Sequence, residues 1–168
     1  MARPCDAVAL RDLRDEAARW MQQQGLAQWR PDEIPLESFD RQVTAGEWHV
    51  ARTGDGVIRA GLRLLWSDAA TWGRAGPVAG YVHGLVVSRE SIGQGLGSQL
   101  LQWAGRTTLA ADRYLLRLDC VESNLRLRRY YLDQGFSEVG RRDLDSAQWH
   151  SITLFERELP GAPDSGSP

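Results

Sequence analysis

Lysine is absent from this chain of 168 residues, so that all 20 basic residues are arginine. Mechanisms that need a lysine Schiff base, a lysine general base or the lysine of a phosphate-binding loop are therefore excluded. The two cysteines, Cys5 and Cys120, are too few and too far apart in sequence for a disulfide framework or a metal site. These absences exclude lysine-dependent mechanisms, a disulfide framework and a cysteine metal site.

An excess of positive charge is also missing, because 20 basic residues face 22 acidic ones and the formal net charge is -2. Such a chain lacks the positive field that non-specific nucleic-acid binding requires. It has no apolar N-terminal segment and no run of about 18 apolar residues, the length that a membrane-spanning helix needs. We expect a cytoplasmic protein with neither nucleic acid nor a membrane as its partner.

Hydrophobic periodicity and turn residues predict one domain over residues 1–159 and a disordered tail over 160–168. Helices are expected at 6–24, 36–44, 98–111 and 124–134, and strands at 48–52, 57–66, 78–87, 114–120, 136–142 and 151–159. The tetrad 53–56 predicts a hairpin, and 67–77 is expected to be a loop. This order predicts a mixed sheet flanked by helices, of the α+β or α/β class.

A glycine-rich loop follows the strand at 78–87. Its sequence is Ile92-Gly93-Gln94-Gly95-Leu96-Gly97-Ser98, and it opens a helix whose first N–H groups can bind an anion such as a diphosphate. A dinucleotide-binding fingerprint would need glycine at position 98, and an ATPase phosphate loop would need lysine. A turn with only a packing role remains the alternative.

A second motif lies downstream, where Asn124 and Tyr131 stand seven residues apart before the pair Gly135-Phe136. Together with the loop, it resembles the Gcn5-related N-acetyltransferase (GNAT) family, and the resemblance covers about residues 6–159. The family's loop pattern of Gln or Arg, two residues, Gly, one residue, then Gly or Ala falls on Ile92, Gly95 and Gly97, so position 92 departs from it. The family's first strand, which precedes the first helix, has little sequence to form it here.

The resemblance implies a GNAT fold, with a mixed, mostly antiparallel twisted sheet whose central strands splay apart between flanking helices. It further implies that acetyl-CoA lies between the strand ending at Val87 and the strand ending at Cys120. The implied cofactor contacts are the main chain of Leu85, Val86 and Val87 for pantetheine, residues Ile92, Gly93, Gln94, Gly95, Leu96, Gly97 and Ser98 for the diphosphate, and Asn124.

The same resemblance places Tyr131 as the general acid that protonates the leaving thiolate, with its neighbour Tyr130 pointing elsewhere on the helix. A role for Tyr131 as a core aromatic is the alternative. For the base, strand alternation puts His83 on the same face as Tyr81 and Leu85, and imidazole suits proton removal near pH 7. A neutral histidine packed in the sheet is equally consistent. Glu47, Glu122 and Glu156 are unranked candidates for a base acting through water.

These residues predict an enzyme that transfers the acetyl group of acetyl-CoA directly to the primary amine of a small molecule, without a metal. Two alternatives stay open: a sensor that binds acyl-CoA without turnover, and an acetyltransferase acting on protein N-termini. A homodimer is not excluded by the sequence. A wall of tryptophans could bind a cationic acceptor, although core packing explains these residues equally well. The tryptophans concerned are Trp29, Trp48, Trp66 and Trp72.

Overall fold

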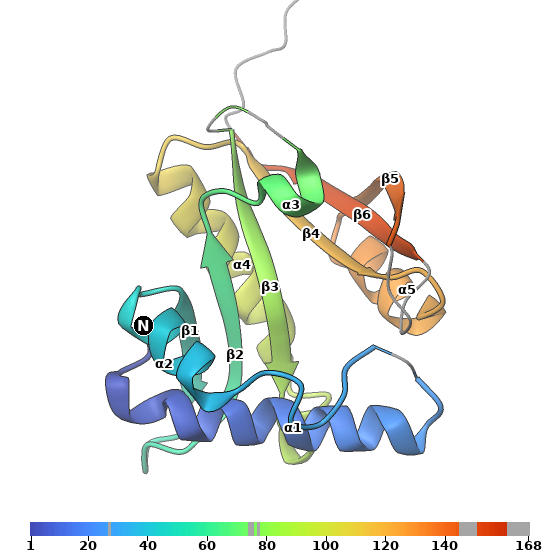
Figure 1. The fold of residues 1–168 in the computed structure, drawn as a ribbon. Coiled ribbons are helices and arrows are strands. Elements are labelled where there is room, and N and C mark those ends of the chain that lie inside the picture. Colours follow the sequence, from blue (N-terminus) through green and yellow to red (C-terminus); the bar gives the residue numbers. More distant parts are fainter. Residues whose placement is uncertain (27, 74–75, 77, 145–150, 161–168) are drawn as a thin grey trace, which may run out of the picture. The chain divides into compact units, whose positions relative to one another are not determined.

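The computed structural model describes residues 1–26, 28–73, 76, 78–144 and 151–160, and its elements are shown in Figure 1. The helices are α1 (Ala7–Gln23), α2 (Leu36–Thr44), α3 (Ala69–Trp72), α4 (Leu96–Ala110) and α5 (Leu125–Asp133), with short 3-10 turns η1 (Pro4–Asp6) and η2 (Arg89–Ser91). The strands are β1 (Trp48–Arg52), β2 (Ile58–Leu65), β3 (Ala79–Val87), β4 (Leu115–Val121), β5 (Ser137–Asp143) and β6 (Ser151–Glu158).

Six strands form one mixed sheet in the order β1-β2-β3-β4-β6-β5. The β1–β2, β4–β6 and β5–β6 pairs are antiparallel, whereas β3 and β4 run parallel. The register of β3 with β4 comprises three pairs, from Ala79–Leu115 to Tyr81–Arg117. The last residues of β3, up to Val87, therefore lie beyond this paired part. The mixed, mostly antiparallel sheet flanked by helices confirms the fold class predicted from the sequence.

The chain forms two compact units, and neither is continuous in sequence. Unit 1 contains Met1–Leu64 and His83–Leu100, and unit 2 contains Leu65–Val82 and Leu101–Pro168. Three elements, β2, β3 and α4, each begin in one unit and end in the other. The assignment of residues 1–159 to a single domain stays a prediction.

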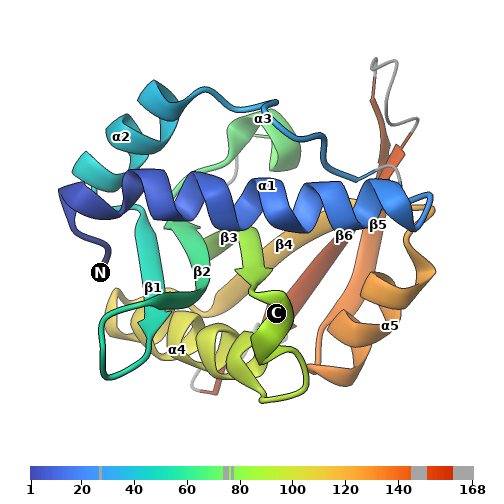
Figure 2. The same cartoon turned by 90° about the horizontal axis from the view of Figure 1, so that it is seen from below.

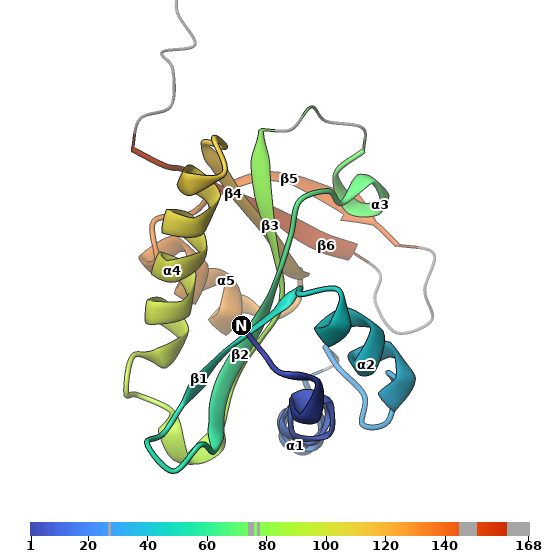
Figure 3. The same ribbon diagram turned by 90° about the vertical axis from the view of Figure 1, so that its left-hand side faces the viewer.

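The core of unit 1 forms where α1 and α2 cover one face of β1 and β2 (Figures 2 and 3). The apolar positions of α1 recur at helical spacing, so that Leu10 and Leu13 are buried while Glu16 and Arg19 face solvent. Burying such a stripe gives most of the stability of a helix in water. The buried cluster also contains Ala2, Ala7, Ala17, Phe39, Val43, Trp48, Ile58 and Val86.

In unit 2, successive side chains of β6 point to opposite faces of the sheet, where they contact different helices. Phe155 contacts the α5 ring of Tyr131 at a centroid distance of 5.5 Å, and Arg157 donates to the carbonyl of Leu101 in α4 at 3.1 Å. Glu156, between them in sequence, binds Arg117, whose guanidinium lies 4.7 Å from the ring centroid of Trp72 in α3. The helices α4 and α5 therefore cover one face of β6 and α3 covers the other.

Most predicted elements are confirmed, and two details differ. The segment predicted as a loop at 67–77 contains α3, whose N-terminus is capped by the Asp68 side chain accepting from Thr71 N at 3.1 Å. Helix α4 begins at Leu96, two residues before its predicted start. No strand precedes α1 in the described residues, although Ala2 N donates to Trp48 O at 2.8 Å. The predicted disordered tail lies outside the described residues, apart from Pro160.

Both cysteines are free thiols, with Cys5 exposed and Cys120 buried. None of the helices in the described part of the chain combines the length and the apolar character that crossing a membrane requires.

We expect a pH-dependent loss of stability from His49 on β1. Burial lowers the pKa of His49 from 6.5 to about 4. Between these values the unfolded chain binds a proton that the folded chain does not, so stability is highest above pH 6.5 and falls toward pH 4. Because the side chain is only partly buried, we expect a loss of roughly 2 kcal/mol. Denaturant unfolding of the wild type and of His49→Gln at pH 7.5 and 4.5 measures it.

Asp6 provides the control for this experiment. Hydrogen bonds from Arg52 lower the pKa of Asp6 below 3.8, so the stability that it contributes is lost only at still lower pH. Asp6→Asn should therefore destabilise the protein at both pH values, while His49→Gln should remove the difference between them. An unchanged difference in His49→Gln would show that another group titrates in this range.

Candidate functional site

The C-terminal end of β3 is shaped by Gly84, which has a positive φ of 59° inside the strand. Only glycine adopts this conformation at little cost, and a Cβ at this position would lie 3.1 Å from Cη2 of the Trp48 ring. Gly84 therefore allows the backbone of β3 to lie close to a tryptophan of the core. The main chain of Leu85, Val86 and Val87 follows directly and leads to the glycine loop.

The glycine loop brings a set of backbone N–H groups to the start of α4. Gly93 and Gly95 have φ values of 83° and 76°, and a Cβ at Gly93 would meet nothing within 4 Å. The first helical hydrogen bond runs from Gln99 N to Gly95 O at 3.0 Å, which makes Gly95 the N-cap. Within the described chain, no acceptor is found for the N–H groups of Gly93, Gly95, Leu96, Gly97 and Ser98.

Two residues of the predicted loop contribute differently. The N–H of Ile92 donates to Arg89 O at 3.4 Å and that of Gln94 donates to Ser91 O at 3.3 Å, so both are used in the turn itself. The Ile92 side chain is 50% exposed. The available N–H groups lie at the positive end of the α4 dipole, where an anion is stabilised. The loop can therefore bind a diphosphate through its backbone.

The turn before the loop is fixed from two sides within unit 1. Arg89 places its guanidinium 3.9 Å from the ring centroid of Trp20 in α1, and Glu90 forms an ion pair with Arg59 of β2. Ser88 N also donates to Arg59 O at 2.7 Å. These contacts fix η2 and with it the start of the glycine loop. No local sequence pattern predicts these contacts, because they join residues far apart in the chain.

In unit 2, Asn124 and Tyr131 both lie where the sequence placed them, at the start and near the end of α5. The Asn124 side chain caps the helix by accepting from Leu127 N at 3.1 Å. Tyr131 is 6% exposed, and its ring packs 6.0 Å from Phe136 and 5.5 Å from Phe155 between ring centroids. Burial raises the pKa of Tyr131 well above 10, so its phenol keeps its proton throughout the neutral range.

The candidate bases differ in their surroundings. His83 is half-buried in β3, at the point where this strand enters unit 1. Each of the three candidate glutamates is bound to an arginine. The pairs are Glu47 with Arg63 at 2.6 Å, Glu122 with Arg141 at 2.8 Å, and Glu156 with Arg117 at 2.7 Å. Hydrogen bonds from Ser151 and Arg141 lower the pKa of Glu122, which makes it a weaker base.

The four tryptophans considered for an acceptor wall have partners of their own. Trp48 is 2% exposed and stacks on Phe39 at a centroid distance of 5.7 Å, so it belongs to the core. The other three each carry an arginine guanidinium over one ring face. These pairs are Arg14 on Trp29, Arg113 on Trp66 and Arg117 on Trp72. A cationic acceptor could use only the opposite faces, and the predicted wall gains no support.

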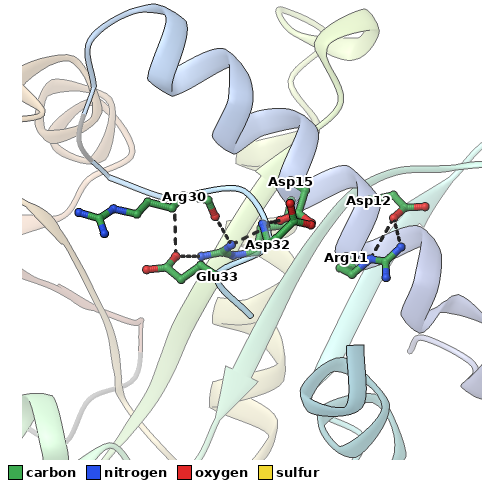
Figure 4. Close-up of polar contacts among 7 residues, drawn as sticks. Arg11, Asp12, Asp15, Arg30, Asp32 and Glu33 are labelled. Carbon is green, nitrogen blue, oxygen red and sulfur yellow. Dashed lines mark hydrogen bonds and ion pairs between the residues drawn. The ribbon is translucent and has the colours of Figure 1, made fainter. Parts of the chain in front are cut away.

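A buried ionic cluster holds residues 30–33, between α1 and α2, against α1 (Figure 4). Arg14 of α1 donates to Glu33 at 2.5 Å and to the carbonyl of Arg30 at 3.3 Å, and it is only 5% exposed. Asp15 accepts from Asp32 N at 3.2 Å. Asp32 has a positive φ of 58°, which suits the position after Pro31 in a tight turn. The cluster fixes this segment as a preformed part of unit 1.

The model of the acetyltransferase (GNAT) family matches residues 10–136. The N-acetyltransferase YesJ of Bacillus subtilis (strain 168) is 31% identical over 161 residues, which cover 92% of this chain and 86% of YesJ.

Solved structures show the same fold. A GNAT-family acetyltransferase from Listeria monocytogenes 4b F2365 matches with a TM-score of 0.76 and 25% identity, covering 94% of this chain and 92% of that one. The acetyltransferase yncA from Salmonella typhimurium, solved with its cofactor acetyl-CoA, matches with a TM-score of 0.69 and 16% identity, covering 98% and 96%.

Proposed function

Because this chain belongs to the acetyltransferase (GNAT) family and is thereby an acetyl-CoA-dependent acyltransferase, we propose that it transfers the acetyl group directly to the primary amine of a small molecule. The single observation that carries this proposal is the set of backbone N–H groups at the start of α4 that have no acceptor among the described residues. Two positive-φ glycines keep side chains away from these groups, which suits the diphosphate of coenzyme A.

Cofactor binding uses the main chain in this proposal. The N–H groups from Gly93 to Ser98 bind the diphosphate, except that of Gln94, which stays in the turn. The backbone of Leu85, Val86 and Val87, beyond the paired part of β3, hydrogen-bonds the pantetheine amides as an added strand would. Asn124 adds a polar contact. Acetyl-CoA itself supplies an activated thioester, so the protein has to orient it and handle protons.

Tyr131 is the proposed general acid. Burial raises the pKa of Tyr131 well above 10, so the phenol holds its proton until the leaving thiolate accepts it.

His83 is the proposed base that removes the proton of the attacking amine. It lies in β3, two residues before the main chain proposed to bind pantetheine, whereas each of the three glutamates binds an arginine. A neutral imidazole can accept the amine proton as a general base. A sensor without turnover and an acetyltransferase of protein N-termini remain outcomes of the test below.

The test measures release of the free thiol of coenzyme A from acetyl-CoA. A panel of small primary amines is compared with their N,N-dimethyl derivatives, which cannot form an amide, and with short peptides that have free N-termini. We expect thiol release with primary amines alone. Release with the peptides alone would identify a protein N-terminal acetyltransferase. Binding of acetyl-CoA without release for any acceptor would identify a sensor.

A further inference from the structure

Coenzyme A carries a diphosphate and a 3′-phosphate, yet the loop proposed to bind it has hardly any positive charge. Ile92 stands where the family pattern has arginine or glutamine, and its exposed apolar side chain binds no phosphate. In the sequence from position 88 to 99, Arg89 is the only basic residue. Backbone N–H groups alone would leave much of the ligand's charge unbalanced.

Arg89 lies one turn before the loop and is held in place. Its carbonyl accepts from Ile92 N at 3.4 Å, and its guanidinium lies 3.9 Å from the ring centroid of Trp20. Stacking uses the flat face of the guanidinium and leaves the N–H donors at its edge available. Arg89 is exposed, so these donors face solvent.

The neighbouring charges do not neutralise Arg89. Glu90, the adjacent carboxylate, is bound to Arg59 of β2. Among the described residues, no carboxylate forms an ion pair with Arg89. Arg89 is therefore a cation that is held in place and forms no ion pair among the described residues. It lies next to a loop that has no other positive side chain.

We propose that Arg89, stacked on Trp20, binds a phosphate of coenzyme A and supplies the positive charge that Ile92 does not. This inference rests on the proposed function, because it assumes that coenzyme A binds at the glycine loop. A planar guanidinium can bind phosphate through two parallel hydrogen bonds. The 3′-phosphate and the diphosphate offer the same chemistry, and the experiment separates them. Trp20 is a positioning residue, since it acts through Arg89.

Calorimetric titration with coenzyme A and with 3′-dephospho-coenzyme A provides the test. We expect Arg89→Gln to weaken coenzyme A binding by about tenfold to a hundredfold, as removal of a charged hydrogen-bonding partner does. Arg19→Gln removes the same charge from an exposed position of α1 beside Trp20 and should leave both affinities unchanged. This control separates a contact from an effect of net charge.

The outcomes are distinct. A loss for coenzyme A alone assigns Arg89 to the 3′-phosphate, and an equal loss for both ligands assigns it to the diphosphate. Trp20→Leu should weaken binding in the same direction, and Trp20→Phe should restore most of it. Wild-type affinities in Arg89→Gln would overturn the inference and leave the proposed function intact. Failure of the wild type to bind either ligand would overturn the proposed function itself.

Discussion

Replacing Tyr131 with phenylalanine is expected to lower kcat by about a hundredfold or more, the range that a general acid contributes, while acetyl-CoA binds as before. The phenolic hydroxyl is the only group that the change removes. The aromatic ring, packed against Phe136 and Phe155, stays in place, so the fold of α5 should be retained. Steady-state kinetics together with calorimetric titration of acetyl-CoA separate the loss of chemistry from a loss of binding.

Tyr130→Phe is the matched control for this experiment. Tyr130 is the preceding residue on the same helix, and its ring centroid lies 5.6 Å from that of Tyr131. The control removes the same hydroxyl group from a residue with no proposed role, so kcat should not change. If both variants turn over like the wild type, Tyr131 is a core aromatic and another group protonates the thiolate.

The second large effect is expected from Gly95→Ala, which should weaken acetyl-CoA binding at least tenfold. A methyl group at the N-cap of α4 would stand among the N–H groups proposed to bind the diphosphate. The residue would also have to keep a φ of 76°, which costs an alanine about 1 kcal/mol or more. Titration of acetyl-CoA measures the first effect, and denaturant unfolding measures the second.

Gly56→Ala distinguishes the two effects. Gly56 lies in the β1–β2 hairpin with a φ of 90° and nothing within 4 Å of an added Cβ. An alanine there imposes comparable backbone strain away from the glycine loop. Both variants should lose similar stability, and only Gly95→Ala should lose affinity. Unaltered binding by Gly95→Ala would remove the start of α4 from the cofactor site.

Local sequence signals were sufficient for much of this fold. The spacing of Leu10, Leu13 and Ala17 predicts α1, and the turn at 53–56 predicts the β1–β2 hairpin, because both depend on residues close together in the chain. Helix α3 was missed for the opposite reason. It is short, and Arg117 and Arg142, which contact it, come from strands far along the sequence.

The same distinction holds for the candidate site. The glycine loop and the step from Asn124 to Tyr131 are local patterns and could be found in the sequence. The three glutamates could not be ranked, because their arginine partners stand 16, 19 and 39 residues away. The stacking of Arg89 on Trp20 is likewise a tertiary contact. Motifs thus locate the proposed cofactor residues, whereas the arginine partners of the candidate glutamates are seen only in the folded chain.

The route of the chain through its two units limits how the protein can be divided. The backbone passes between them after Leu64, after Val82 and after Leu100, and these passages lie inside β2, β3 and α4. Any single truncation therefore discards residues of both units or leaves one of them incomplete. Variants that shorten either end should be judged as changes to the entire catalyst, and point substitutions are the appropriate means of dissecting it.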